Sequence, residues 1–428
     1  MAIKNKKIWI SLLFTALFLF IYRLGYWIQV PFVEIEYVKQ LFSSGESMFG
    51  FLDVFSGGAL SNFSIVALGI SPYITSSIVI QLLQMDIVPV LKEWSEEGQV
   101  GKEKLNQLTR YLALGLAFVQ AMTLTIGISV SYNNALFGPG TPITPMTYIY
   151  LSIVMTAGTA FVLWIAERIT QKGIGNGTSM IIVAGIVASF PDMISDLINK
   201  YIVSGGEKIG NIFIFFGVIL LMILIIIIVI FMETAQRKIP IQYANRPAAA
   251  SFRGRSDSNV PIKLNTASVI PVIFASTLMS LPTTIANFLT NSTAKTWITN
   301  IFSSSKPIGF VLYIVLIFVF SFFYAFLQIN PEKMAENLQK QNAYVPGIRP
   351  GDETAAYFSR VLFKITMVGA TYLSIVAAIP IIATKIFGLP SSIQVGGTSL
   401  IIVVGVAIET VKQLKTQSQE KQYRGFID

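Results

Sequence analysis

The chain has 428 residues, of which 53% are hydrophobic and only 12% are charged, and its formal net charge is +9. This composition excludes an ordinary soluble globular protein, in which about a quarter of the residues are charged. The sequence contains no cysteine and no histidine, which excludes disulfides and removes the usual general base and the commonest metal ligands. We therefore expect no enzymatic activity, no cofactor and no metal site.

The chain begins with a basic segment that leads into a long apolar run. This pattern is similar to a signal peptide, but no small-residue cleavage site follows and Arg23 interrupts the run, so we interpret it as a retained first span. We expect the Arg23 side chain to extend toward the interface or to hydrogen-bond to backbone carbonyls at the end of the span. A functional role for Arg23 is the alternative.

The next apolar stretch, residues 47–64, is rich in Gly and Ser and too short to cross a bilayer. Non-helical backbone at membrane depth is stable only where protein or a water-filled cavity shelters it. Residues 67–74 then enter a helix through Gly69 and Pro72. A short re-entrant segment before an interrupted helix indicates a conduction path; a segment lying on the membrane surface is the alternative.

Hydropathy predicts ten membrane-spanning helices. Apart from Arg23, the cores of these spans contain no charged residue, which argues against an ion-coupled transporter, although backbone carbonyls can also bind sodium. Of the 31 Lys and Arg, 24 lie at the termini and in alternate loops, and six lie on the opposite side. The positive-inside rule therefore places both termini in the cytoplasm, and anionic lipid accounts for most of the excess charge. The predicted spans are residues 8–28, 65–84, 108–131, 146–167, 174–193, 209–232, 266–289, 308–329, 361–384 and 397–411.

Two of the cytoplasmic loops are predicted to contain regular secondary structure. Residues 238–243 and 260–264 alternate between apolar and polar side chains around a polar tip near 248–257, which predicts a small β-hairpin. In the second loop, Asn330 and Pro331 favour a helix start, and a Pro-Gly pair at 346–347 predicts a turn. For the basic segment at 236–255, an ordinary solvated loop is the alternative.

Seven segments of the sequence resemble the SecY family of bacterial protein-conducting channels, which is related to eukaryotic Sec61-alpha. They occur in the order expected for the family and extend over essentially the whole chain. All the segments together identify the family far more specifically than any single segment does. The segments are FSGGALS (55–61), ALGISPYI (67–74), QLL (81–83), GIGNG (173–177), VIPVIFAS (269–276), YVPGIRPG (344–351) and GGTSLII (396–402).

The resemblance implies an all-α polytopic membrane protein with ten transmembrane helices. These form two inverted five-helix halves, residues 1–193 and 194–428, around a central pore. It further implies a re-entrant plug near 48–62, including Phe51, Phe55, Ser56, Gly57 and Gly58. A narrow apolar constriction would exclude ions by dewetting and would bind no particular side chain. The implied pore ring is Ile70, Ile74, Ile182, Ile270, Ile273 and Ile402.

The resemblance also implies a lateral gate between spans 2 and 3 and spans 7 and 8. Uncharged polar residues at such a seam would form hydrogen bonds of only about 1 kcal/mol, and for each one ordinary helix packing is the alternative. Ser268 and Thr178 depart from the family pattern and predict a slightly more polar waist. The implied gate residues are Thr75, Gln120, Asn265 and Thr277.

The implied function is passive conduction of secretory polypeptides across, and release of membrane segments into, the bacterial cytoplasmic membrane. The implied partners are the small subunits SecE and SecG, the motor ATPase SecA, the ribosome through its RNA, signal-sequence-bearing substrates and membrane lipid. The alternatives are an accessory paralogue for specialised export, a secondary transporter, and an insertase or scaffold without a through-pore. The implied docking residues are Arg237, Lys238, Arg246, Arg253, Arg255 and Arg349.

Overall fold

The computed structural model describes residues 6–34, 38, 53, 56–84, 87–131, 144–203, 209–243, 258–286, 292–389 and 391–424. Within these residues, seven helices are long and apolar enough to cross a membrane. A helix satisfies its backbone hydrogen bonds internally, which lipid requires because an unpaired backbone group there costs several kcal/mol. The seven are α1 (Lys6–Gly25), α6 (Gln99–Ser131), α7 (Pro145–Lys172), α8 (Gly177–Ile198), α9 (Ile209–Thr234), α12 (Pro307–Gln328) and α14 (Asp352–Phe387).

Three further helices match the remaining predicted spans, so each of the ten predictions overlaps one helix. They are α4 (Ser71–Leu83), α10 (Ile270–Ala286) and α15 (Ser391–Arg424). The predicted boundaries differ most at α6, α14 and α15, which extend beyond their apolar parts as polar helices. Hydropathy detects only the segment that lipid covers, whereas a helix can continue into water.

Two short helices were not predicted as separate elements. They are α5 (Pro89–Glu96) and α11 (Ser292–Phe302). Each is too short to cross the membrane. A π-helical turn, η2 (Asn199–Val203), continues α8.

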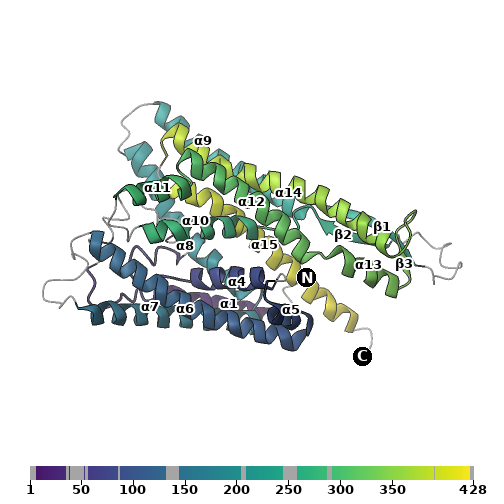
Figure 1. Ribbon diagram of the computed structural model, residues 1–428. Helices are drawn as coiled ribbons and strands as arrows, with labels where there is room; N and C mark the ends of the chain where they lie inside the picture. Colours follow the sequence, from purple (N-terminus) through teal and green to yellow (C-terminus); the bar gives the residue numbers. More distant parts are fainter. Residues whose placement is uncertain are drawn as a thin grey trace.

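The membrane helices form two groups that face each other (Figure 1). Helix α7 packs against α1, α6 and α8 in the first group, and α12 packs against α10 and α14 in the second. The groups meet where α4 contacts α10 and where α8 contacts α15. This arrangement confirms the predicted fold class of a helical, multi-pass membrane protein.

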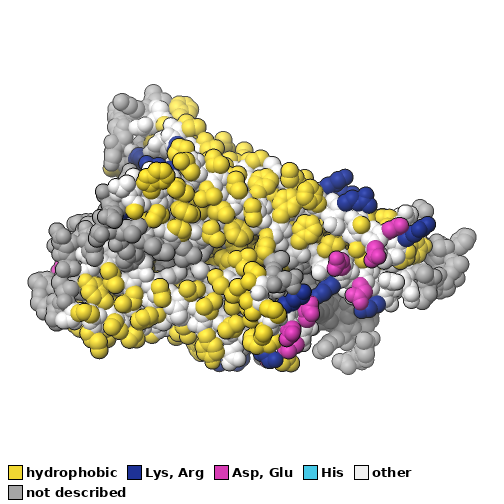
Figure 2. All heavy atoms as spheres, viewed as in Figure 1, with side chains coloured by type: hydrophobic (Ala, Val, Ile, Leu, Met, Phe, Trp, Pro, Cys, Tyr) yellow, Lys and Arg dark blue, Asp and Glu magenta, His cyan; other side chains and the backbone are white. Residues whose placement is uncertain are grey.

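The surface is consistent with a lipid environment. Figure 2 shows hydrophobic side chains over most of the middle of one face, while most of its charged side chains gather at the end that carries the strands. On α9, Phe213, Phe216 and Phe231 are each more than 60% exposed. Such side chains would be costly in water and are stable in contact with lipid tails.

The turn between α7 and α8 explains the glycines at 173–177. Gly175 has φ +82°, a conformation that L-residues rarely adopt. Side-chain oxygens satisfy two amides of the turn: Thr15 accepts from Ile174 N at 3.0 Å, and Thr170 accepts from Gly177 N at 2.8 Å. Asn176 caps α8 by accepting from Thr178 N. The turn therefore joins α1, α7 and α8 into one unit.

The predicted hairpin is confirmed, and the second loop extends it. Strands β1 (Gln236–Tyr243) and β2 (Ser258–Lys263) pair antiparallel, with Arg237 opposite Ile262. A third strand, β3 (Ala343–Tyr344), pairs with the other edge of β1 and gives the order β2-β1-β3. Helix α13 (Pro331–Lys340) precedes β3 and has the predicted Asn330 cap. Isoleucines of β1 and β2 pack on Leu338 and Phe358, so both loops form one folded unit.

Candidate functional site

The six isoleucines of the implied pore ring lie in one apolar cluster. Ile70, Ile182 and Ile402 belong to its buried core, with exposures of 5% or less, while Ile74, Ile270 and Ile273 pack against it half-buried. They come from α4 and its N-cap, α8, α10 and α15. The structure therefore places in one cluster side chains that lie more than 300 positions apart in sequence, while their role in lining a pore stays a prediction.

The described part of the implied plug lies directly beside two ring positions. A side-chain carbon added at Gly57 would lie 2.9 Å from Cα of Gly185, one turn beyond Ile182 on α8. A side-chain carbon added at Gly69, which precedes Ile70, would lie 3.6 Å from Cα of Ser56. Gly57 and Gly58 have φ +70° and +80°. Phe51 and Phe55 lie outside the described residues.

Residue Asp53 closes the turn that carries these glycines. Its carboxylate accepts from Ser61 N at 2.8 Å, and its backbone carbonyl accepts from Gly58 N at 2.8 Å and Ser56 Oγ at 2.9 Å. Burial raises the pKa of the Asp53 carboxyl to about 6, and the nearby Asp192 also acts to raise it. The hydrogen bonds from Ser61 and the amide of Leu60 act in the opposite direction but do not cancel the desolvation.

The implied gate residues have ordinary structural partners. Thr75 Oγ1 donates to Ser71 O at 3.1 Å in its own helix, and Thr277 is buried on α10. Asn265 Nδ2 donates to Glu233 Oε1 at 2.8 Å, so its bond joins α10 to the end of α9. Gln120 is half-buried on α6. Their role in a gate stays a prediction.

A hydrogen bond across the seam was missed by sequence reasoning. Tyr324 Oη on α12 donates to Gln81 Oε1 on α4. Gln81 Nε2 donates to Ser77 Oγ at 3.1 Å, which orients the amide, and the Tyr324 ring packs edge-on against Phe274 of α10 at 5.1 Å. The signal was present, because Gln81 lies in the QLL segment. Its partner is 243 residues away, and only the fold brings the two together.

The prediction that Ser268 and Thr178 make the waist more polar stays a prediction, and the structure gives each hydroxyl a partner. Ser268 Oγ donates to Glu233 Oε1 at 3.3 Å, and Thr178 Oγ1 donates to Asn176 Oδ1 at 2.7 Å. Both hydroxyls are therefore engaged at helix ends. Ser268 has φ +54°, which explains why glycine suits this position.

Three of the implied docking residues are described, and they lie on or beside the sheet. Arg237 and Lys238 are exposed on β1, and the Arg349 side chain is 88% exposed with Nη1 4.0 Å from Glu353 Oε1. The turn behind Arg349 is fixed, because Thr354 Oγ1 donates to Arg349 O at 2.7 Å. Arg246, Arg253 and Arg255 lie outside the described residues.

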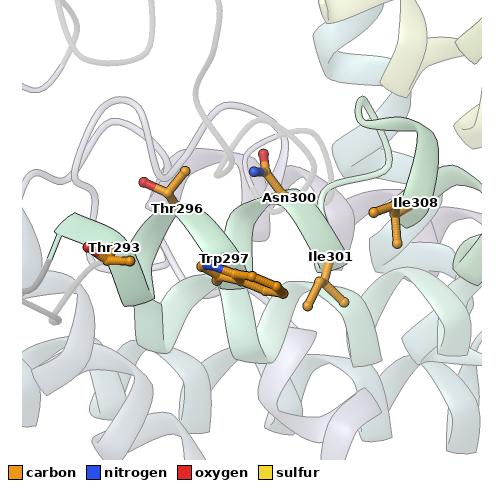
Figure 3. Close-up of a pocket in the computed structure, with 6 residues that line it drawn as sticks. All are labelled: Thr293, Thr296, Trp297, Asn300, Ile301 and Ile308. Carbon is orange, nitrogen blue, oxygen red and sulfur yellow. The ribbon is translucent and has the colours of Figure 1, made fainter.

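A cavity of about 470 Å³ lies at α11 and the start of α12 (Figure 3). Its lining is uncharged, and none of the predicted site residues contributes to it. Among the described residues, no cluster of acidic side chains could hold a metal ion. The lining residues are Thr293, Thr296, Trp297, Asn300, Ile301 and Ile308.

Comparisons with known proteins agree with this architecture. The SecY family model matches residues 64–411. Protein translocase subunit SecY of Bacillus licheniformis is 46% identical over 427 residues, covering 99% of this chain and 96% of that protein. The Bacillus subtilis protein of the same name is 44% identical over 426 residues, covering 99% and 96%.

Solved structures share the fold at low sequence identity. One, described as the structure of a protein conducting channel, has TM-score 0.63 and 17% identity, covering 97% of this chain and 94% of that chain. Sec61 in the canine ribosome-channel complex from the endoplasmic reticulum has TM-score 0.61 and 17% identity, with the same coverage. With the family match and the curated relatives, these findings establish that the chain belongs to the SecY family.

Proposed function

We propose that this chain is the pore-forming subunit of a protein translocase in the bacterial cytoplasmic membrane. It provides a passive path for unfolded secretory polypeptides and a lateral exit for membrane segments. The observation that carries this proposal is that all six ring isoleucines, from α4 and its N-cap, α8, α10 and α15, belong to or pack against one apolar cluster. The high identity to Bacillus relatives named as translocase subunits favours this function over transporter, scaffold or accessory roles.

The chemistry of the ring suits a path for diverse sequences. A narrow apolar constriction loses its water and blocks ions. Isoleucine side chains offer no hydrogen bond or charge, so a passing chain meets no site that would bind one residue type and stall it. The side chains therefore seal against ions and still let polypeptides slide.

The Ser56–Gly58 segment is proposed to act as the plug. Its backbone packs beside the ring at Gly69 and Gly185, where it would obstruct the path on one side of the constriction. A related solved structure is described as showing that the SecY plug domain stabilises the closed state and maintains a membrane seal. Residues 1–193 and 194–428 are proposed as the two halves, with the gate between α4 and α6 on one side and α10 and α12 on the other.

The sheet and Arg349 are proposed to form a cytoplasmic docking platform, with both chain ends on the same side. Positive charge on exposed loops attracts RNA phosphate in a salt-dependent manner and also suits an acidic protein surface. The proposed partners are the ribosome and the motor SecA, which would supply the energy, together with the small subunits SecE and SecG. Relatives of this fold occur in ribosome complexes.

Crosslinking of a stalled secretory chain tests the pore. A photoreactive side chain at Ile74 or Ile273 should crosslink to the stalled polypeptide, because both positions pack against the central cluster. The same group at Ile227, which is 61% exposed on α9, is the matched control and should crosslink to lipid. Strong crosslinks at other positions, with none at Ile74 and Ile273, would contradict the pore assignment.

A further inference from the structure

The charged side chain in the first span, Arg23, contacts other parts of the protein. Arg23 lies near the end of α1 and is half-buried. Its Nη1 donates to the backbone carbonyl of Gly57 at 2.7 Å, and its guanidinium carbon lies 4.0 Å from the ring centroid of Tyr26. The predicted contact with a backbone carbonyl is thus confirmed, but the carbonyl belongs to the plug segment.

The residue before Arg23 makes the same kind of contact. Tyr22 is 3% exposed, and its hydroxyl donates to the carbonyl of Ser56 at 3.2 Å. Two successive side chains of α1 therefore bind two successive carbonyls of the plug segment. The Tyr26 ring, which faces Arg23, also lies 3.4 Å from the point where Gly58 would carry a side chain.

The backbone conformation of the plug segment allows the carbonyls of Ser56 and Gly57 to accept these hydrogen bonds. The left-handed conformations of Gly57 and Gly58 turn the chain sharply, and the bare backbone at Gly57 lies against α8. A hydrogen bond to backbone does not depend on the side chains of the plug. The contact is charge-assisted and lies in a region of low dielectric, so it is stronger than a bond between neutral groups.

We propose that Arg23 is the positioning residue that holds the plug segment in its closed seat, by binding the Gly57 carbonyl from the first span. This inference rests on the proposed channel function. When the segment leaves, the guanidinium would face the opened, hydrated path, so opening would not leave an unpaired charge in lipid. Arg23 would thereby set how often the idle channel opens.

Ion leak through the idle channel tests this role. The chain, purified with the small subunits that assemble with it, is reconstituted in a planar bilayer without substrate. Arg23→Met should raise the open fraction roughly tenfold, the effect of losing a charge-assisted hydrogen bond. Arg23→Lys, which keeps one charged donor, should restore part of the seal. Arg168→Met is the matched control, because Arg168 is also half-buried and lies 5.6 Å from the ring of Trp164, but its hydrogen bond goes to Gln171 on its own helix and not to the plug segment.

The absence of native cysteine allows a second readout. In a Ser61→Cys background, an aqueous thiol reagent should label the plug segment faster in the Arg23→Met variant. If that variant does not assemble, Tyr22→Phe carries the same test and should raise labelling by a few fold. If an assembled Arg23→Met complex still translocates but shows unchanged ion leak and unchanged labelling, the proposed role of Arg23 is wrong, and the proposed channel function is not affected. Failure of the unsubstituted complex to translocate any secretory chain would instead overturn the proposed function.

Discussion

Ser268 shows how one residue can depart from a family pattern without disturbing the site. Its left-handed backbone, at φ +54°, is a conformation that favours glycine. The serine gains a compensating hydrogen bond from its hydroxyl to Glu233, whose carboxylate also accepts from Asn265. Asn265 Nδ2 in turn donates to Ser268 O at 3.1 Å. These three residues fix the start of α10 to the end of α9.

Titration of the Asp53 carboxyl should make the seal of the idle channel against ions depend on pH. The pKa of the Asp53 carboxyl in the packed segment, about 6, lies above the ordinary aspartate value of 3.8. The packed segment therefore binds a proton more tightly than a displaced, solvated segment would. The proton therefore stabilises the closed state below pH 6, and this stabilisation is lost as the pH rises through 6. We expect the idle ion leak to fall on the order of tenfold between pH 7 and pH 5.

Conductance recorded across this pH range provides the measurement, and Asp53→Asn provides the control. Asparagine keeps the oxygen that accepts from Ser61 N but does not titrate in this range. Its leak should not vary with pH. The role of Asp53 would be contradicted if the ion leak of the unsubstituted channel rose on acidification. It would also be contradicted if the unsubstituted channel and the Asp53→Asn variant showed the same pH dependence.

At the level of elements, a side-chain hydrogen bond crosses the seam between α4 and α12, and aromatic packing between α10 and α12 lies beside it. Tyr324 donates to Gln81 across this seam, while Phe274 and Phe320 pack edge-on beside it with ring centroids 5.8 Å apart. A hydrogen bond between membrane helices is worth only about 0.6 kcal/mol on average. Such a seam can therefore open when a hydrophobic helix gains more by entering lipid.

Tyr324→Phe should make this seam easier to open. Loss of the bond to Gln81 removes about 0.6 kcal/mol, so translocation of a substrate with a weakly hydrophobic signal should rise about threefold. Tyr313→Phe is the matched control, since the Tyr313 hydroxyl lies 3.3 Å from Ser276 Oγ within the same half. Equal effects of the two substitutions, measured by transport assay, would show that the bond to Gln81 does not restrain the gate.

At the scale of the whole molecule, the sheet is continuous with the helices around the ring. Strand β1 follows α9 directly, and residues 264–269 join β2 to α10. Helix α14 begins three residues after Arg349. A partner that binds the sheet and the Arg349 turn would therefore be attached to α9, α10 and α14 at once, and its docking could shift the helices of the proposed gate.

Arg349→Glu tests the docking platform without disturbing the fold. The side chain is 88% exposed and its contact with Glu353 is at the limit of an ion pair, so reversal should change stability by less than about 0.5 kcal/mol. Motor-driven translocation should fall roughly tenfold, because like charge now opposes an acidic partner surface. Arg360→Glu, at an exposed position on α14, is the control for net charge. Normal translocation by Arg349→Glu would refute the docking role.

The sequence by itself determined the ten spans, the hairpin and the Asn330-capped helix, because hydropathy, strand alternation and capping are local properties of the chain. The motif resemblance also selected six isoleucines that the structure gathers in one cluster. Sequence did not reveal β3, because a two-residue strand has no pattern of its own and forms only where β1 offers a free edge.

Only the tertiary structure decided which partners the polar side chains have. Arg23 is 34 residues from Gly57, and Gln81 is 243 residues from Tyr324. No spacing rule predicts such pairs, because helix packing sets the distance between them. Asn265 and Ser268 illustrate the same point, since the sequence did not reveal that both bind Glu233, more than 30 residues away. Local pattern thus predicted which segments cross the membrane, and helix packing decided which polar side chains meet.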